Sequence, residues 1–324
     1  HPQLSIHRGH LQMRLWDEAV QRLGPDQVRT GERVVAARET ANGAVAEILH
    51  ADGTRSERAC DILVGADGIH SALRQQFYPD EGAPRWNGMM MWRGTTLARP
   101  FLDGRTMVQA GHRRAKFVVY PIEPVRPDGL QRINWICDRR LREDGFGGGL
   151  TAPSREDWSK PGSLDDLLPT FGSWRFAWLD VPGLIRAAEQ ILEWPMVDRD
   201  PLPRWRHGHT TLLGDAAHPM YPIGSNGATQ AILDAAALAD ALDGHASITA
   251  ALNAYEAARL PMTRDIVAMN RREGLDAILD MVEEAAPEGF ARIEDVTDPT
   301  VLAEWVQAYK KAAGHQVGRP QAAH

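Results

Sequence analysis

The sequence predicts a protein of mixed α/β (α+β) class, in which an antiparallel sheet is set into a second, helix-containing layer. Residues 89–138 contain several strand-like runs with no helix between them. Two apolar runs, at 61–64 and 210–213, are each followed by glycine and aspartate, and residues 226–242 show a strong helical period. A length of 324 residues suits about two domains. The composition, with 24% charged and 43% hydrophobic residues, excludes a disordered chain.

The first part of the chain predicts one helix followed by three short strands. Apolar residues recur at helical spacing from Gly9 to Leu23, where Gly24-Pro25 ends the pattern. Strands are expected at 34–35, 45–49 and 61–64. Asn42-Gly43 and Asp52-Gly53 lie between them and are typical of tight hairpin turns, because glycine readily adopts positive φ.

The middle of the chain predicts an antiparallel sheet. Its strand-like runs lie at 89–96, 106–110, 116–120 and 133–137, and strands that follow one another without helices pair antiparallel. Short helices are expected at 164–168 and 184–191.

The last third contains the clearest helix of the sequence, at 226–242. We expect its buried face to consist of residues at spacings of four and three, namely Ala228, Ile232, Ala235, Ala239 and Leu242. A second helix is expected over 248–259, with Pro261 interrupting it before the helical pattern resumes towards Leu279. Residues after Gly314 show no pattern.

Composition excludes several classes of protein. The formal net charge of -7 offers no electrostatic footprint for nucleic acid, and no apolar run is long enough to cross a membrane. Cys60 and Cys137 are the only cysteines, which favours a reducing, cytoplasmic location. His207, His209 and His218 have no third type of ligand near them in the sequence, so we expect no metal site.

The first segment whose residues could bind a ligand surrounds Asp67-Gly68. An apolar run delivers this carboxylate at a glycine turn, Ser71 is a plausible cap for the helix that follows, and Arg74 could reach either Asp67 or a phosphate. The alternative is a strand–turn–helix corner with a local ion pair.

The second segment is Gly214-Asp215, after the run 211–213. Small residues there allow a backbone to approach a ligand closely, and an ionised Asp215 would accept hydrogen bonds from sugar or ribityl hydroxyl groups. The alternative is a packed turn with a capping aspartate.

The third segment, residues 221–228, leads into the strong helix. Its first turn carries no acidic residue, and the next carboxylate is Asp234, so the helix start presents N–H groups and a partial positive charge. Such a start suits a negatively charged group. Alternatively, Ser225 or Asn226 caps the helix.

These three segments, in this order, resemble the aromatic-ring hydroxylases of the FAD-dependent monooxygenase superfamily. Asp67-Gly68 looks like the motif that this family shares between FAD and NAD(P)H, and Gly214-Asp215 looks like its second FAD motif. Residues 5–11 are similar to a further FAD-contacting segment. The resemblance therefore implies a Rossmann-like FAD/NAD(P)-binding layer with the following cofactor-binding residues: Arg8, Val34, Asp67, Gly68, Arg74, Gly214, Asp215, Gly224, Asn226, Gly227 and Ala228.

The resemblance also implies an activity. NAD(P)H would reduce FAD, and O2 would then give a C4a-hydroperoxide that hydroxylates an aromatic ring; the phenazine-hydroxylating branch of the family is the most similar. Pro222 and Gly224 match positions beside the flavin ring and substrate. Aromatic, methionine and arginine side chains of the sheet region suggest a substrate surface made of Met91, Arg93, Tyr120, Trp135 and Tyr221. Alternatively, the large apolar residues form core and Arg93 pairs on the surface.

One feature departs from the family pattern. A glycine-rich G-x-G-x-x-G turn with its βαβ unit is not found before Arg8, and the glycine cluster at 145–149 opens no apolar helix. We therefore expect a fragment of a longer enzyme, the alternative being impaired FAD binding. The expected parts are a discontinuous FAD-binding domain (1–85 and 195–275), a substrate domain (86–194) and a helical segment with a tail (276–324).

Other functions stay open from the sequence alone. A flavin-dependent reductase or epoxidase of a lipid-like substrate, and a truncated, non-catalytic binding fragment, are both compatible with it. The resemblance also allows a homodimer.

Overall fold

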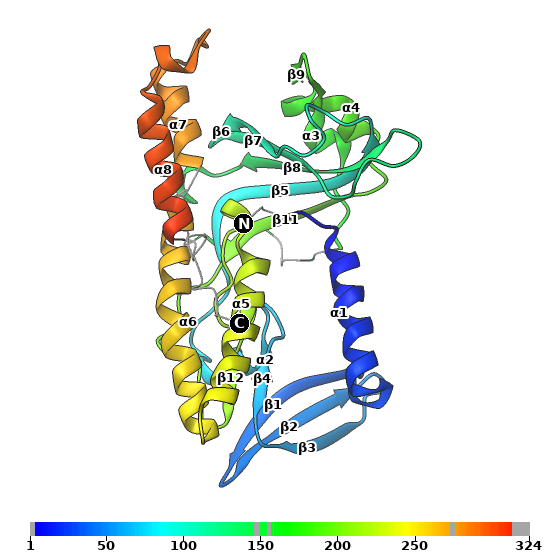
Figure 1. Cartoon of the computed structure of the whole chain (residues 1–324), viewed down its shortest axis with the longest axis vertical. Coiled ribbons are helices and arrows are strands. Elements are labelled where there is room, and N and C mark those ends of the chain that lie inside the picture. Colours follow the sequence, from blue (N-terminus) through cyan, green and yellow to red (C-terminus); the bar gives the residue numbers. More distant parts are fainter. Residues whose placement is uncertain (1–3, 146–149, 154–156, 158, 273–275, 313–324) are drawn as a thin grey trace, which may run out of the picture.

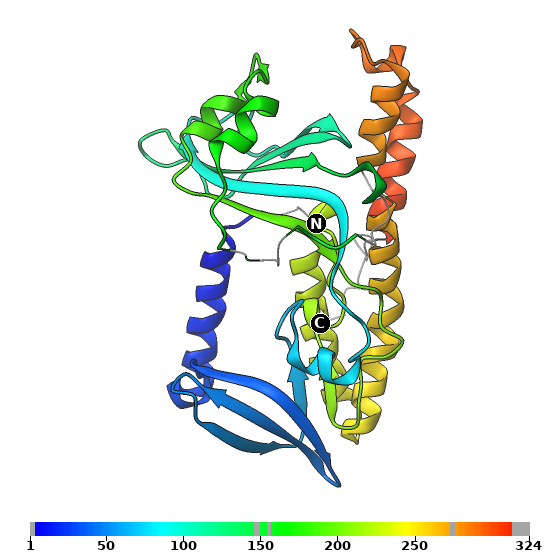
Figure 2. The same cartoon turned by 180° about the vertical axis from the view of Figure 1, so that it is seen from behind.

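A computed structural model describes most of the chain, namely residues 4–145, 150–153, 157, 159–272 and 276–312. It confirms the mixed α/β class, with an antiparallel sheet distinct from the other elements (Figures 1 and 2). The glycine cluster at 146–149 and the patternless tail after Gly314 lie outside the described residues.

A helix and a small antiparallel sheet come first. Helix α1 (Arg8–Leu23) is followed by a 3-10 turn (Pro25–Gln27) and by a sheet of order β1-β2-β3. The strands are β1 (Glu32–Thr40), β2 (Gly43–His50) and β3 (Arg55–Cys60). Hairpins form at both predicted turns, but the second joins β2 to β3 and not to the strand expected at 61–64. The sequence did not predict β3, because this edge strand is exposed along almost its whole length and carries no apolar alternation.

A second, two-stranded sheet brings together distant parts of the chain. Strand β4 (Leu63–Gly65) pairs in parallel with β12 (Thr210–Leu212), with Leu63 opposite Thr210 and Gly65 opposite Leu212. The strand predicted at 61–64 therefore begins two residues later than expected. Helix α2 (Ala72–Phe77) follows β4.

The five-stranded antiparallel sheet, of order β11-β5-β8-β7-β6, confirms the predicted sheet region. Its strands are β5 (Arg85–Ala98), β6 (Val108–His112), β7 (Ala115–Pro121), β8 (Gln131–Arg140) and β11 (Ile191–Asp198). The chain enters the sheet through β5 and leaves it through β11, and these two strands pair with Arg85 opposite Asp198. The ends of this segment are therefore adjacent.

Side chains alternate between the two faces of this sheet. One face packs a large apolar core, including Trp92 and Trp135, against α3 (Leu164–Phe171) and α4 (Val181–Arg186). The opposite face carries a smaller cluster that includes Met91 and reaches Tyr221 and Ile223. The two-residue strands β9 (Arg175–Phe176) and β10 (Leu179–Asp180) form a hairpin before α4.

The helix expected at 184–191 is corrected by the structure. Helix α4 starts earlier, because the Asp180 side chain caps it by accepting a hydrogen bond from the Gly183 N–H (3.2 Å) and Pro182 suits its first turn. Ile191 belongs to β11 instead.

Two long helices form the next layer, α5 (Gly227–Gly244) and α6 (Ile248–Arg271), and they confirm the predicted helix at 226–242. The predicted buried face of α5 is wrong, since Ile232 is 54% exposed and the other residues of that stripe are exposed as well. The buried residues are Gln230, Asp234, Leu238 and Ala241. A polar network, rather than an apolar stripe, joins this helix to α6.

Pro261 does not interrupt α6, which runs through it. The proline lies on an exposed face of the helix, where water can hydrogen-bond to the carbonyl that its missing N–H leaves without a partner.

The last helices, α7 (Asp276–Ala285) and α8 (Pro299–Ala312), lie beyond the β6 end of the sheet (Figures 1 and 2). Buried Lys116 of β7 binds both Asp138 (3.1 Å) and Asp276, which anchors the start of α7 to the sheet. None of the described helices is both long and apolar enough to cross a membrane.

Candidate functional site

The two aspartate segments lie side by side in space. Because β4 and β12 are parallel neighbours in register, the residues that follow them emerge at the same edge of the sheet. The Leu213 N–H also donates to the Gly65 carbonyl (2.9 Å), which extends the pairing to the point where both chains turn. Asp67 and Asp215 are therefore presented together, as the sequence order alone did not guarantee.

The Asp67-Gly68 corner is a defined turn. Gly68 has φ +79°, and the Asp67 carboxylate accepts a hydrogen bond from the Ala72 N–H at 2.8 Å. Ser71 caps α2 as expected, accepting from the Arg74 N–H at 3.0 Å. A side-chain carbon placed at Gly68 would meet nothing within 4 Å, so this corner is open to a ligand on that side.

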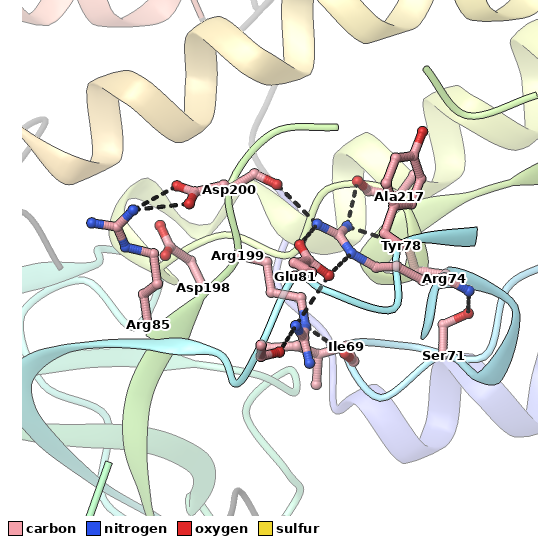
Figure 3. Close-up of polar contacts among 12 residues, drawn as sticks. Ile69, Ser71, Arg74, Tyr78, Glu81, Arg85, Asp198, Arg199, Asp200 and Ala217 are labelled. Atoms are coloured by element: carbon pink, nitrogen blue, oxygen red, sulfur yellow. Dashed lines mark hydrogen bonds and ion pairs between the residues drawn. The ribbon is translucent and has the colours of Figure 1, made fainter. Parts of the chain in front are cut away.

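Arg74 is a correction to the expected cofactor set. Its side chain is 1% exposed and turns inward (Figure 3). It binds Glu81 through two nitrogens and donates to the backbone carbonyls of Ala217 (2.8 Å) and Asp200 (2.8 Å). All its directions are used within the protein, so Arg74 ties the two aspartate turns together and has no donor left for a phosphate. Neither of the two expected roles is correct, because the partner that attracts Arg74 is Glu81 and not Asp67.

The Gly214-Asp215 turn is attached to α5 through its backbone, while the Asp215 side chain has no hydrogen-bond partner among the described residues. Gly214 has φ +59°, and its N–H donates to the buried Asp234 carboxylate at 3.0 Å. The Asp215 carboxylate makes no hydrogen bond to any described residue, so it does not cap the turn. The protein around it removes enough water to raise its pKa, while His218 and Arg8 oppose that shift. Asp215 itself is solvent-exposed although protein atoms crowd around it, so its carboxylate oxygens are accessible as acceptors.

The start of α5 is uncapped. Neither Ser225 nor Asn226 caps it with a side chain, and its first turn contains no acidic residue. Ser225 adopts φ +58°, which is unusual for a residue other than glycine and is found at sites where structure is held for function. A side-chain carbon at Gly227 would also meet nothing within 4 Å. There is therefore open space on the Cβ side of Gly227, the first residue of the helix.

Arg8 and Val34 lie on different sides of this region. Arg8 begins α1, and its positive charge lowers the pKa of both Asp215 and Arg93, which places its guanidinium within electrostatic range of both. Ser5 fixes the approach to the helix by donating to the Pro121 carbonyl (2.6 Å). Val34 lies on β1 at a β-bulge and is partly buried. Strand β1 starts near the carboxyl end of α1, whereas Arg8 begins that helix (Figure 1).

The expected substrate residues do not all lie on the same face of the five-stranded sheet. Met91, Arg93 and Tyr120 share one face of the five-stranded sheet, as the register of β5, β8 and β7 requires. Tyr221 packs against Met91 on this face and lines a small cavity of about 30 Å³, with room for about one water molecule. Trp135 is a correction. It lies on the opposite face at 0% exposure, because it is opposite Gly94, one residue out of phase with Met91 and Arg93.

Arg93 is held ready for an anion. Its Nε donates to the Asn134 Oδ1 at 2.6 Å, and this is its one hydrogen bond to the described residues. Burial lowers its pKa, and nearby Arg8 lowers it further. Two positive charges near each other, with no carboxylate bound to Arg93, would be relieved by a negatively charged ligand.

Sequence reasoning missed four residues of the site. Asn134 is fully buried on a strand otherwise rich in apolar residues, and that contrast was the available signal. Asp234, His218 and Arg259 support the Gly214 turn, yet on the sequence each is indistinguishable from an ordinary helix or loop residue. Among the described residues, no group of three or more histidine, cysteine, aspartate or glutamate side chains could hold a metal ion.

A cleft of about 520 Å³ adjoins the first aspartate corner. His70, Ser71 and Gln75 line one side, and Thr151 with Arg199 contribute elsewhere. Its volume is typical of sites for small molecules and cofactors.

Parallel strand ends, positive-φ glycines and an open helix start together define a nucleotide-cofactor protein of the α/β class. The family model described as "FAD binding domain" matches residues 10–148 and 182–270, and the chain belongs to that family.

The chain is similar to proteins named as a hydroxylase and a monooxygenase of aromatic acids, and to a solved structure that contains FAD. The chain is 46% identical over 278 residues to "Phenazine 1,6-dicarboxylic acid hydroxylase PhzS" of Lysobacter antibioticus, covering 84% of this chain and 66% of that protein. It is 37% identical over 257 residues to "3-amino-4-hydroxybenzoate 2-monooxygenase PtnB3" of Streptomyces platensis, covering 78% and 59%. Its fold matches Klebsiella pneumoniae HpxO complexed with FAD and uric acid (TM-score 0.61, 24% identity, 94% and 67% covered). The chain thus spans less than two thirds of these curated relatives.

The residues of the site fit FAD on structural grounds. Asp215 is a carboxylate without a hydrogen-bond partner among the described residues, Arg8 lies within its electrostatic range, and the start of α5 at Gly227 has no side-chain cap. By their chemistry, these three elements suit hydroxyl groups, a diphosphate and an electron-rich ring, all of which FAD carries.

Proposed function

We propose that this chain forms the larger part of an FAD-dependent monooxygenase that hydroxylates a small aromatic acid, of phenazine type, with NAD(P)H and O2. The observation that supports this most strongly is the parallel register of β4 and β12, which sets Asp67 beside Gly214-Asp215. The proposed parts are an FAD-binding domain (1–85 and 195–275) and a substrate domain (86–194). The family model matches residues from both proposed parts, 10–148 and 182–270.

FAD would be held by groups from four elements. Asp215 would accept hydrogen bonds from ribityl hydroxyl groups, Arg8 and the Asp67-Gly68 corner would bind nearer the diphosphate, and Val34 would offer its backbone towards the adenosine. Gly224 and the start of α5 would face the flavin ring, where N–H groups and the helix dipole stabilise negative charge. When bound, FAD supplies electron transfer from NAD(P)H and activation of O2.

The substrate would bind on the open face of the five-stranded sheet. We propose that Arg93 binds its carboxylate, that Asn134 orients Arg93, and that Met91, Tyr120 and Tyr221 contact the ring. Pro222, which precedes Gly224 on the loop, would separate this ring from the flavin. The relatives named above act on aromatic acids, which supports a carboxylate-binding arginine.

We propose that the reductant uses the cleft beside Asp67-Gly68. Its 520 Å³ volume suits part of a dinucleotide, and it opens at the motif that the family resemblance assigns to both nucleotides. Free Cys60 and Cys137 agree with a reducing cytoplasm. A homodimer stays a prediction.

The function is tested by spectroscopy and turnover. Purified protein titrated with FAD should show flavin absorbance and quenched flavin fluorescence. It should then oxidise NAD(P)H faster when an aromatic acid is added, with an oxygen atom incorporated from ¹⁸O2 into the product. Turnover with lipid-like substrates alone would favour a reductase or epoxidase, and failure to bind FAD would favour a non-catalytic fragment.

Arg93→Ala is expected to raise the KM for an aromatic acid at least about 10-fold, because a charge-assisted contact is worth about 1.5–3 kcal/mol. The carboxamide analogue of the same substrate should lose much less. Arg99→Ala, an exposed arginine just beyond β5, is the matched control. Equal losses for the acid and its amide would contradict a carboxylate contact. Initial rates over a substrate series measure the effect.

A further inference from the structure

A fully buried carboxylate supports the Gly214-Asp215 turn from beneath. Asp234 of α5 is 0% exposed. Its Oδ2 accepts hydrogen bonds from the Gly214 N–H (3.0 Å) and from the His218 Nε2 (2.6 Å), while its Oδ1 accepts from the Arg259 Nε (2.7 Å). One side chain therefore joins the turn to both long helices.

The charge of Asp234 is fully compensated. Burial alone would raise its pKa, but hydrogen bonds from His218, Arg259 and the Gly214 amide outweigh that effect and leave the pKa below its ordinary value. Arg259 is 5% exposed and is itself oriented by the Gln230 side chain at 2.6 Å. Asp234 thus stays ionised and can only accept hydrogen bonds.

His218 is held by this carboxylate in turn. Its ring is 3% exposed, packs against Trp205 with ring centres 5.3 Å apart, and has no hydrogen-bond partner at Nδ1 among the described residues. Its backbone N–H closes the turn by donating to the Gly214 carbonyl at 2.9 Å. Both ends of the turn are consequently attached to Asp234, one directly and one through His218.

The turn conformation decides where Asp215 points. Gly214 needs positive φ, and a side-chain carbon there would lie 3.3 Å from the Ala231 Cβ, so the turn sits tightly on α5. Rotation about Gly214 would change the direction in which the next residue, Asp215, presents its carboxylate. A hydrogen bond at the Gly214 N–H opposes that rotation.

We propose that Asp234, compensated by Arg259 and His218, is a positioning residue that fixes the Gly214 turn so that Asp215 can bind a flavin nucleotide. Asp234 does not touch the ligand in this arrangement and acts through Asp215. The proposal rests on the proposed function, because the ligand of Asp215 is FAD there.

A double-mutant cycle tests the proposal. Asp234→Asn should raise the Kd for FAD about 10-fold in the otherwise unchanged chain, measured by flavin fluorescence. In the Asp215→Ala background the same change should raise it less than about 2-fold, because the group that it positions is already gone. A purely structural role would give the same factor in both backgrounds, and that result would overturn the proposal.

Asp280→Asn is the matched control. Asp280 is also buried and also accepts a backbone N–H from another element, that of Arg113 at 2.8 Å, but it lies on α7 away from the turn. The control should lower the melting temperature by a similar amount and leave the FAD Kd within about 2-fold. An equal rise in Kd for both variants would overturn the positioning role.

Amide hydrogen exchange tests whether Asp234 holds the turn, independently of whether the chain binds FAD. In apoprotein, Asp234→Asn should speed exchange of the Gly214 amide at least about 10-fold, and Asp280→Asn should not. If the unmutated chain binds no FAD, the proposed function fails, and the exchange result alone decides whether Asp234 holds the turn. Unchanged exchange at Gly214 would overturn the proposal whatever the chain binds.

Discussion

Asp215→Ala is expected to raise the Kd for FAD about 100-fold. An ionised carboxylate that accepts hydrogen bonds from ligand hydroxyl groups contributes about 1.5–3 kcal/mol, and each 1.4 kcal/mol is a factor of ten in affinity. Asp215 is available for this role because its carboxylate makes no hydrogen bond within the described chain. Fluorescence titration of the apoprotein with FAD measures the change.

Glu283→Ala is the control for this measurement, since Glu283 is an exposed acid on α7. Its Kd should stay within about 2-fold of the unmutated chain, as surface changes rarely matter. Equal dissociation constants for the two variants would refute the role of Asp215.

The pH dependence of FAD binding gives a second view of the same carboxylate. Desolvation raises the pKa of Asp215, so its charged form is lost at a higher pH than for an ordinary aspartate. Affinity should therefore fall as the pH decreases through that raised pKa. In Asp215→Asn this part of the pH dependence should disappear.

Arg74→Ala is expected to lower stability by about 3 kcal/mol, because it removes a buried guanidinium and leaves Glu81 with Arg199 as its one remaining described ion-pair partner. Glu81 would lose two hydrogen bonds, and the carbonyls of Asp200 and Ala217 would each lose one. For a chain of this length the melting temperature should fall by about 10 °C. Thermal unfolding followed by circular dichroism measures it.

Arg22→Ala is the comparison for Arg74. Arg22 also pairs with a glutamate, Glu18, but its side chain is 74% exposed, so the change should cost less than about 1 kcal/mol. A melting temperature for Arg74→Ala within about 2 °C of the unmutated chain would contradict the structural role. A loss of FAD affinity without loss of stability would instead restore the direct cofactor contact that the sequence suggested.

Much of the fold followed from local patterns. The hairpin at Asp52-Gly53 was predictable because Gly53 takes positive φ (+85°) in its turn, whereas the Asn42-Gly43 hairpin forms without positive φ at either residue. The exposed edge strand β3 was not, since a strand with no buried face carries no alternation. The buried side of α5 was wrong for a related reason, because Gln230 and Asp234 are buried through hydrogen bonds that hydrophobicity does not register.

In the candidate site, too, some residues could be predicted from local sequence patterns and others could not. Asp67 and Asp215 were recognisable because each follows an apolar strand at a glycine turn, and the parallel register of β4 and β12 joins them. The partners of Arg74 could not be read locally, since Ala217 lies 143 residues away. The expected placement of Trp135 on the substrate face was wrong, because a shift of one residue along a strand moves a side chain to the other face of the sheet.

The adjacent entry and exit of the five-stranded sheet have an evolutionary consequence. Because Arg85 and Asp198 face each other across neighbouring strands, the segment between them forms a cassette whose ends meet. Recombination could exchange such a cassette while Arg74, Asp234 and the turn that they anchor remain in place. The sheet segment and the proposed FAD-binding residues could then evolve independently within one gene.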